Sequence, residues 1–274
     1  MTATRSDFAG GNQEYLRSEQ YVNSERLARR AGLHDRYSTA EISWYDWVSA
    51  RFDLVADSDV LEVGCGAGWV WERSTVAVPP GISLILTDYS AGMVEEAVER
   101  VNATQRLAAV TGRTADAQSL PFGDCLFDRV IANHMLYHLP DPERGVSELA
   151  RVVRPDGLVV VATNGRHHMQ ELAQIRSHVF DLPTVDQTVD VFGAETGFAI
   201  LRQHFGEVRW LQRHDVLHCT DPADVLAYAT STPPGETADD DQRAMLEALV
   251  SQAFDRGHGT MTITKDTGIF VCRL

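Results

Sequence analysis

Alternate glycines follow a short apolar segment near residue 60, and this pattern has the clearest chemical meaning in the chain. Val60-Leu61-Glu62-Val63 runs directly into Gly64-Cys65-Gly66-Ala67-Gly68. Glycine at every second position lets the backbone turn sharply and approach a ligand without an intervening Cβ atom. The segment therefore predicts a strand that ends in a ligand-binding loop.

An acidic residue stands where the next predicted strand ends. The apolar run 82–86 stops at Asp88, about twenty residues after the glycine loop. A carboxylate in this position of an open α/β sheet can accept hydrogen bonds from both ribose hydroxyls of an adenosine. We expect Asp88 to bind the sugar of a nucleoside-containing ligand.

The glycine spacing distinguishes between two kinds of nucleoside ligand. The dinucleotide fingerprint is G-x-G-x-x-G, whereas this loop reads G-x-G-x-G and has Trp69 where the third dinucleotide glycine would fall. A tryptophan there obstructs the close approach of helix and pyrophosphate. The chain also has no G-x-x-x-x-G-K-[ST] sequence for a nucleoside triphosphate. An adenosyl ligand without phosphate fits better, and glycines that merely shape a turn are the alternative.

Continuous apolar strands alternate with amphipathic helices between residues 59 and 163. This alternation is typical of a parallel sheet with helices on both faces. Later in the chain, residues 194–204 predict a helix and Thr260–Cys272 a final strand. The predicted strands are 60–63, 82–86, 129–132 and 158–162, and the helices between them are 91–102 and 142–153.

The N-terminal part predicts helices of its own. Residues Asn12 to Gly32 have a partly apolar helical face. Ser38-Thr39-Ala40-Glu41 is a capping-box pattern that could open a second helix.

Four motifs in this order resemble the class I S-adenosylmethionine-dependent methyltransferases, and the resemblance covers residues 60–163. The motifs are the glycine loop, Asp88-Tyr89-Ser90 with Met93, the segment Asp116 to Phe122, and the run from Phe127 through His138 to Gly157. The resemblance implies a doubly wound, mostly parallel seven-stranded α/β sheet with one antiparallel C-terminal strand. We divide the chain into a helical N-terminal lid, residues 1–53, and an S-adenosylmethionine-binding domain, residues 54–274, with a substrate cap around 166–205.

The resemblance also implies roles for residues around the cofactor. Glu62 would organise the glycine loop, and Asp88 would bind the ribose. The remaining residues implied at the cofactor are Gly64, Gly66, Gly68, Tyr89, Met93, Asp116, Ala117 and Asn133.

Histidines after the predicted strands are candidates for proton transfer, because imidazole titrates near neutral pH. His134, His138 and His167 are candidate general bases, and each could instead be a surface or capping residue. His134 and His138 have metal-ligand spacing but lack the H-E-x-x-H pattern, so no metal is expected. Substrate-binding candidates are Tyr21, Arg29, Tyr37 and His168.

Net charge and hydropathy limit the kinds of binding partner that the sequence predicts. The net charge of −15 and the pI near 5.0 argue against a nucleic-acid partner, which needs a concentrated basic surface. No apolar run approaches the length of a membrane span, and residues 1–11 lack the apolar stretch of a secretory signal. We expect a cytoplasmic monomer or homodimer.

The predicted activity is methyl transfer from S-adenosylmethionine to an oxygen or nitrogen of a small metabolite, in secondary metabolism. Carbon methylation, a dinucleotide-dependent oxidoreductase and a non-catalytic nucleoside-binding module remain alternatives. The small-metabolite acceptor and the role in secondary metabolism rest on family analogy, because a fold by itself does not determine the substrate.

Overall fold

The computed structural model describes residue 9, residues 12–16, 18, 21 and 24–274, without the side chains of residues 25, 26 and 29. Seven strands form one sheet in the order β3-β2-β1-β4-β5-β7-β6. The first five are parallel, and β7 is antiparallel to both of its neighbours. The doubly wound, mostly parallel sheet is confirmed. The strands are β1 (Asp59–Val63), β2 (Ser83–Asp88), β3 (Ala109–Thr114), β4 (Phe127–Asn133), β5 (Val153–Asn164), β6 (Glu207–Cys219) and β7 (Met261–Arg273).

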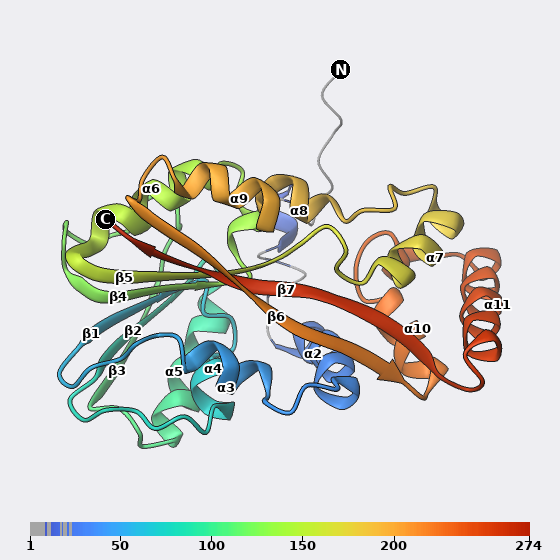
Figure 1. Ribbon diagram of the computed structural model, residues 1–274, viewed down its shortest axis with the longest axis horizontal. Coiled ribbons are helices and arrows are strands. Elements are labelled where there is room, and N and C mark those ends of the chain that lie inside the picture. The colour runs from blue at the N-terminus through green and yellow to red at the C-terminus, as the bar shows by residue number, and fades with distance from the viewer. Residues whose placement is uncertain (1–8, 10–11, 17, 19–20, 22–23) are drawn as a thin grey trace.

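Helices cover both faces of the sheet (Figure 1). The cover arises because successive strand residues point to opposite faces and both sets are apolar. One face carries α3 (Trp44–Ser49), α4 (Trp69–Arg73) and α5 (Ala91–Ala103), and the other carries α6 (Pro142–Val152), α8 (Gln187–Phe192) and α9 (Ala194–Leu201).

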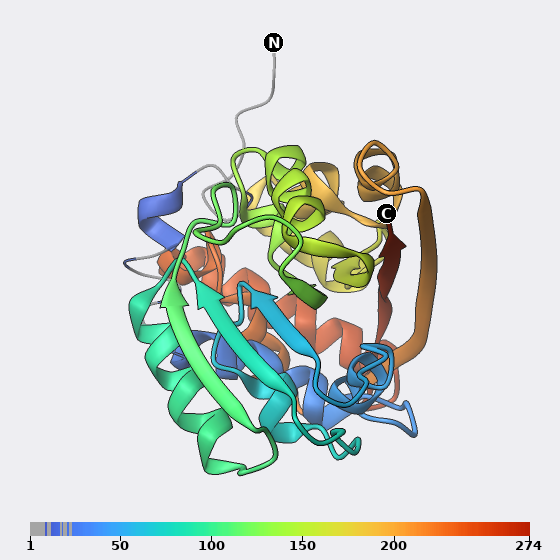
Figure 2. The ribbon, with the colours of Figure 1, turned by 90° about the vertical axis from the view of Figure 1, so that its left-hand side faces the viewer.

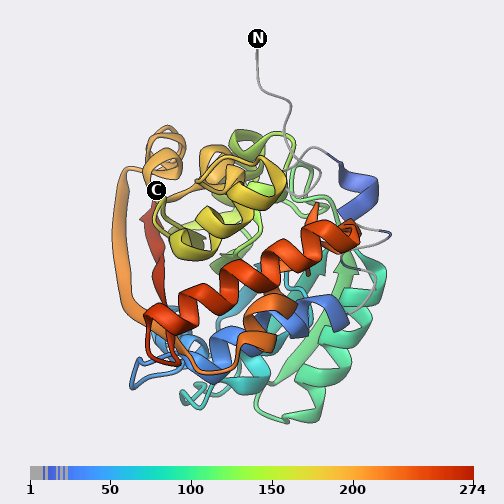
Figure 3. The same cartoon turned by 90° about the vertical axis from the view of Figure 1, so that its right-hand side faces the viewer.

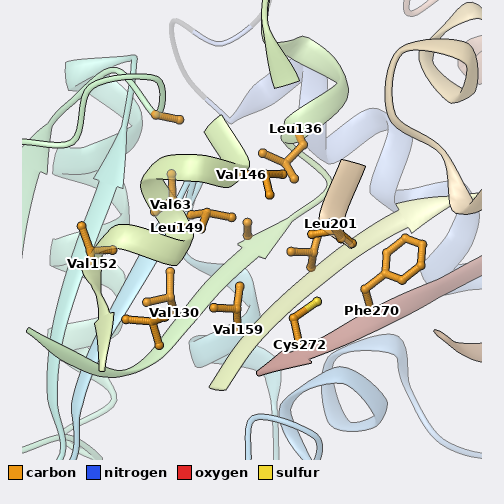
Figure 4. Packing of buried hydrophobic residues seen from close by; sticks show 14 of the residues in the cluster. Val63, Val130, Leu136, Val146, Leu149, Val152, Val159, Leu201, Phe270 and Cys272 are labelled. Carbon is orange, nitrogen blue, oxygen red and sulfur yellow. The ribbon is translucent and has the colours of Figure 1, made fainter. Parts of the chain in front are cut away.

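The central strands divide their side chains between two cores. Val130 and Val159 pack with Val146 and Leu149 of α6 under one face (Figure 4). Their neighbours Ile131 and Leu158 pack under the opposite face. Full burial of one such side chain stabilises the fold by about 1.5–3 kcal/mol.

β6 and β7 extend well beyond the end of β5 and carry a third apolar cluster (Figure 1). β7 pairs with β5 only as far as Thr267, whereas its pairing with β6 continues to Met261. α11 crosses this end of the molecule (Figure 3). The helices around the extension are α2 (Glu25–Tyr37), α7 (Gln170–Phe180), α10 (Pro222–Ala229) and α11 (Asp240–Arg256). The short elements are α1 (Gln13–Tyr15), η3 (Leu136–His138) and η4 (Gly235–Thr237).

The prediction of one helix from Asn12 to Gly32 was wrong in its bounds. α2 continues past Gly32 to Tyr37, and among the described residues before it α1 covers Gln13–Tyr15. Residues 17, 19, 20, 22 and 23 of the predicted helix lie outside the part of the chain that the structure describes. Glycine inside a helix costs about 1 kcal/mol relative to alanine. Leu33 and Tyr37 offset that cost because both are buried in the third cluster.

The capping box at Ser38–Glu41 was also wrong. The next helix begins at Trp44, and the Ser43 side chain accepts the cap hydrogen bond from the Asp46 amide at 3.0 Å. Asp215 of β6 accounts for the difference, because its carboxylate accepts hydrogen bonds from the Thr39 and Ala40 amides, both at 3.2 Å. A contact from the far end of the chain thus holds residues 39 and 40, and the Ser38 amide instead ends α2 by donating to the His34 carbonyl.

Candidate functional site

The glycine loop follows β1 with the backbone that its sequence predicted. Gly64, Gly66 and Gly68 all have positive φ, at +67°, +51° and +74°. A Cβ atom at Gly64 would lie 2.7 Å from Met135, and one at Gly68 would lie 3.1 Å from the Ala97 Cα atom. At Gly66 the nearest atom would be Leu27 Cδ2 at 3.6 Å, so this glycine is the least crowded of the three.

Asp88 connects the end of β2 to this loop. Its carboxylate accepts hydrogen bonds from the Gly66 amide at 3.0 Å and from the Ser90 amide at 2.9 Å. Burial raises the pKa of Asp88, and the backbone donors oppose that shift. Figure 2 shows β1, β2 and β3 ending at one edge of the sheet, where parallel α/β folds bind their ligands.

Glu62 organises the floor of the loop from the buried end of β1. One carboxylate oxygen accepts from Trp71 Nε1 at 2.7 Å, and the other accepts from Asn133 Nδ2 at 3.2 Å. Burial raises the pKa of Glu62 to about 8. The remaining amide oxygen of Asn133 is buried and has no hydrogen-bond partner among the described residues. A buried oxygen without a partner can accept a hydrogen bond from a donor on a bound molecule, such as an amino group.

The predicted adenine-side residues lie beside Asp88. Tyr89 exposes 44% of its surface, whereas Met93 is fully buried at the start of α5. Asp116 accepts hydrogen bonds from the Gln118 amide at 2.8 Å and from its side chain at 3.2 Å, and Ala117 is buried. The exposed ring of Tyr89 offers a flat apolar surface for a base.

α2 lies over the glycine loop. Leu27 is its nearest side chain to Gly66, and Arg30, one turn further on, is buried. The Arg30 guanidinium lies 5.7 Å from the centre of the Tyr21 ring. Burial raises the pKa of Tyr21, and the Asp88 carboxylate acts in the same direction. Tyr21 and α2 therefore face the predicted ribose site.

His134 and His138 follow β4, as predicted. His134 has φ +53°, and its ring centre lies 5.1 Å from that of Trp44. Burial, with the Lys265 charge, lowers its pKa to about 3, so the imidazole is neutral at physiological pH. His138 Nε2 lies 2.9 Å from the Tyr21 hydroxyl. His167 is exposed, and its ring contacts Gln170 rather than this group.

The substrate-binding candidates do not all come together. The Tyr37 hydroxyl donates to Asp224 of α10 at 2.6 Å. Arg29 lies in α2, but its side chain is outside the part of the chain that the structure describes. His168 lies in the turn after β5, its ring centre 6.0 Å from that of His34.

Lys265, close to His34 and His168, was not predicted as a site residue. Lys265 Nζ lies 3.0 Å from His34 Nδ1, although the two are far apart in sequence. Burial lowers the pKa of Lys265 to about 7. A signal was present: on β7, Met261, Ile263, Lys265, Thr267 and Ile269 share one face, and the other four are buried. A lysine in such a series must lie between packed elements.

The fold and the loop together define a class of protein. The chain has an open α/β sheet, an acid at the end of β2, and a glycine loop whose spacing suits a ligand without phosphate. Together these features fit a nucleoside that carries an amino-acid-like extension. Residues 61–161 match the model of a family described as "Methyltransferase domain". This segment is a methyltransferase domain of the class I, S-adenosylmethionine-dependent type, and the cofactor of that type is S-adenosylmethionine.

Individual proteins agree with this placement. The chain is 36% identical over 116 residues to Methyltransferase GfsG of Streptomyces halstedii, covering 41% of this chain and 40% of that protein. It is 34% identical over 116 residues to a malonyl-[acyl-carrier protein] O-methyltransferase of Hahella chejuensis, covering 42% and 40%. The chain thus spans about two fifths of the length of these curated relatives.

Solved structures show the same fold. The crystal structure of the [4+2]-cyclase SpnF superimposes with a TM-score of 0.57 at 20% identity, over 93% of this chain and 94% of that one. At this identity the likeness concerns architecture alone. In the described part of the chain, no helix has the length and apolar character that crossing a bilayer requires.

Proposed function

We propose that this protein transfers the methyl group of S-adenosylmethionine to an oxygen or nitrogen atom of a small metabolite, in secondary metabolism. The observation that carries the proposal is the cradle formed by Gly66 and Asp88 beside the unpartnered Asn133 oxygen. The family match and a relative named as an O-methyltransferase support it.

The cofactor fits the groups that the chain offers. Gly64, Gly66 and Gly68 would pass under its amino-acid portion, and the Asn133 oxygen would accept from its ammonium. Asp88 would hold the ribose with the carboxylate lone pairs that the loop leaves free. The adenine would lie against Tyr89 and Met93, with its edge toward Asp116 and Ala117.

The bound cofactor supplies an electrophilic methyl group, and the protein's contribution is alignment and exclusion of water. Trp44, His134 and Tyr137 form an aromatic wall beyond β4, with ring centres 5.1 and 6.4 Å apart in succession. This wall would shield the acceptor atom. Because His134 is neutral, it can orient a hydroxyl by a hydrogen bond.

Two measurements test the proposal. Calorimetry should show binding of S-adenosylmethionine and no binding of NAD, since the loop lacks the third dinucleotide glycine. Release of S-adenosylhomocysteine in the presence of candidate acceptors would then demonstrate an enzyme. NAD binding without S-adenosylmethionine binding would refute the proposal, and cofactor binding without turnover on any acceptor would favour a non-catalytic module. A product methylated at carbon would move the assignment to C-methylation.

A further inference from the structure

Lys265 is the only lysine in the chain, among 24 lysine and arginine residues. All other permanent side-chain cations are arginines, whose guanidinium stays charged at any physiological pH. The single ammonium belongs to a half-buried side chain on the inward face of β7. A lysine differs from an arginine in this place because burial can make the amine neutral and therefore basic.

Lys265 lies at the edge of the sheet where the candidate functional site is. β7 runs antiparallel to β5, and their last pair joins Asn164 to Thr267. Lys265, two residues further along β7, lies roughly 7 Å beyond that pair at the usual strand rise. It therefore stands past the carboxyl ends of β5 and β4, the edge from which His134 and Asn133 also extend.

α2 links this position to the cofactor loop. Leu27 faces Gly66, and His34 contacts Lys265. Seven residues are almost two helical turns, so the two side chains share one face of α2 and lie about 10 Å apart along its axis. Arg30 stands between them on the same face and is buried. The residue of α2 that contacts Lys265 thus lies about 10 Å along the helix axis from the residue that faces the cofactor loop.

The groups around Lys265 are mostly basic or neutral. Its one hydrogen-bond partner among the described residues is His34 Nδ1, at 3.0 Å. His168 has a hydrogen bond to the backbone of Asp266, and its Nδ1 atom is buried without a partner in the described part of the chain. The charged or titratable groups that act on this cluster are His34 and Asp35 of α2, His134 after β4, His168 after β5, and Arg213 and Asp215 of β6.

We infer that Lys265, with His34 and His168, forms the binding site of a weakly acidic hydroxyl group, such as a phenol or enol, and that Lys265 takes its proton. This inference rests on the proposed function, because it names the acceptor class of the same site. In the step, the O–H bond breaks and its electron pair stays on oxygen. The lone pair of the lysine nitrogen forms the new N–H bond, giving an oxyanion beside an ammonium. The unpartnered His168 Nδ1 atom would receive the hydroxyl hydrogen bond before the transfer.

Electrostatics agree with this arrangement. Burial is the largest cause that lowers the pKa of Lys265 to about 7, and the Arg213 charge adds to it while Asp215 and Asp35 oppose it. Burial also lowers the pKa of both His34 and His168 well below the usual value. Near pH 7 the cluster therefore holds neutral imidazoles and an amine that can exchange one proton. A neutral acid would bind there and leave the site balanced in charge.

The single lysine permits a direct test in the full chain. Lysine-selective ¹³C labelling yields one Cε signal, which reports protonation of the amine without assignment. We expect its titration midpoint near pH 7, about three pH units below the usual value of about 10.4. The variant Arg256→Lys adds a second, exposed lysine at the end of α11, and its signal should titrate at the usual value. A wild-type midpoint near 10 would overturn the inference.

The probe for the acceptor is 4-nitrophenol, whose anion absorbs visible light. At pH 7 we expect the protein to bind it as the anion, with the Lys265 signal moving to its protonated position. Lys265→Met should abolish the absorbance change, and Arg256→Lys should retain it. A Lys265 signal that stays unmoved at millimolar probe would refute the site.

Both readouts need neither cofactor nor turnover, so they separate this inference from the proposed function. Normal titration of Lys265 in a protein that binds S-adenosylmethionine would remove the inference and leave the methyltransferase. If the protein shows a shifted midpoint and binds nitrophenol but does not bind S-adenosylmethionine, the proposed function is removed and the inference about Lys265 stands.

Discussion

The Gly66 amide donates a hydrogen bond to the Asp88 carboxylate at 3.0 Å, so the acid at the end of β2 also holds the loop that follows β1. A second bond, from the Ser90 amide at 2.9 Å, fixes the same carboxylate to the start of α5. The two strands are neighbours in the sheet, and their ends are therefore coupled through one side chain. The loop geometry and the ribose site depend on the same residue.

Replacing Asp88 by alanine should weaken S-adenosylmethionine binding by about 1–3 kcal/mol, which is about 5- to 150-fold in Kd. The change removes an ionised acceptor from the ribose and leaves the Gly66 amide without its partner. Calorimetry on the purified variant gives the number. Asp255→Ala, on an exposed position of α11, is the matched control and should leave Kd unchanged. Equal affinity for wild type and Asp88→Ala would remove Asp88 from the ribose site.

Gly66→Ala should damage cofactor binding more than it damages folding. Alanine at φ +51° carries a backbone cost of roughly 1–2 kcal/mol. Its methyl group meets only Leu27, at 3.6 Å, and would otherwise occupy the space of the ligand. Gly259→Ala is the control, because Gly259 also has positive φ (+91°) and has no atom within 4 Å. We expect similar losses in urea unfolding for both variants, and a loss of cofactor affinity in Gly66→Ala alone. An equal affinity in both would contradict the cradle.

The buried half of the sheet was predictable because its strands are uninterrupted apolar runs. β1, β2, β4 and β5 were all found from this pattern, and β7 from its alternation. β3 was missed, because Ala109–Thr114 is an edge strand with a glycine, an arginine and mostly exposed side chains. β6 gives a weak apolar signal, since this edge strand alternates with charged residues.

The part of the site that short local sequence motifs define was predictable. The glycine loop with Asp88 forms from segments that neighbouring strands place at one edge, so their spacing sufficed. The contact of His34 with Lys265 joins α2 to β7 through tertiary packing, and no local pattern relates the two residues. Asp215 illustrates the same limit, because it holds residues 38–40 from the other end of the chain. The lid of residues 1–53 and the cap around 166–205 remain predictions.

Lys265→Met should change how stability depends on pH. The folded pKa of Lys265 is about 7, whereas the unfolded chain titrates at about 10.4. Between these values the unfolded state binds more protons, so this lysine makes the wild-type free energy of unfolding rise with pH. Methionine lacks that contribution. We expect the variant to gain stability relative to wild type below pH 7 and to lose this gain as the pH approaches 10.4.

Urea unfolding of both proteins at pH 6, 8 and 10 provides the comparison, at values chosen to lie around the window of about 7 to 10.4. Glu62 acts in the opposite direction, since its raised pKa of about 8 makes stability fall as the pH rises from its usual value of about 4.3. Because Glu62 is present in both proteins, its contribution cancels in the difference. Parallel pH profiles for the two proteins would mean that Lys265 is not perturbed.

Arg213 and Asp215 form an ion pair at 2.7 Å whose side chains are only 5% and 1% exposed. Arg213 also donates to the Ile42 carbonyl at 2.8 Å, so the pair holds the segment between α2 and α3 against β6. Asp215→Ala would leave the guanidinium buried and unpaired, a change that costs about 3–5 kcal/mol in such pairs. The Arg166–Asp190 pair, with side chains 47% and 56% exposed, is the control, and Asp190→Ala should cost less than about 1 kcal/mol. Unfolding midpoints in urea compare the two variants directly. A cost for Asp215→Ala as small as that of the exposed pair would show that the segment between α2 and α3 is not held against β6 by this contact.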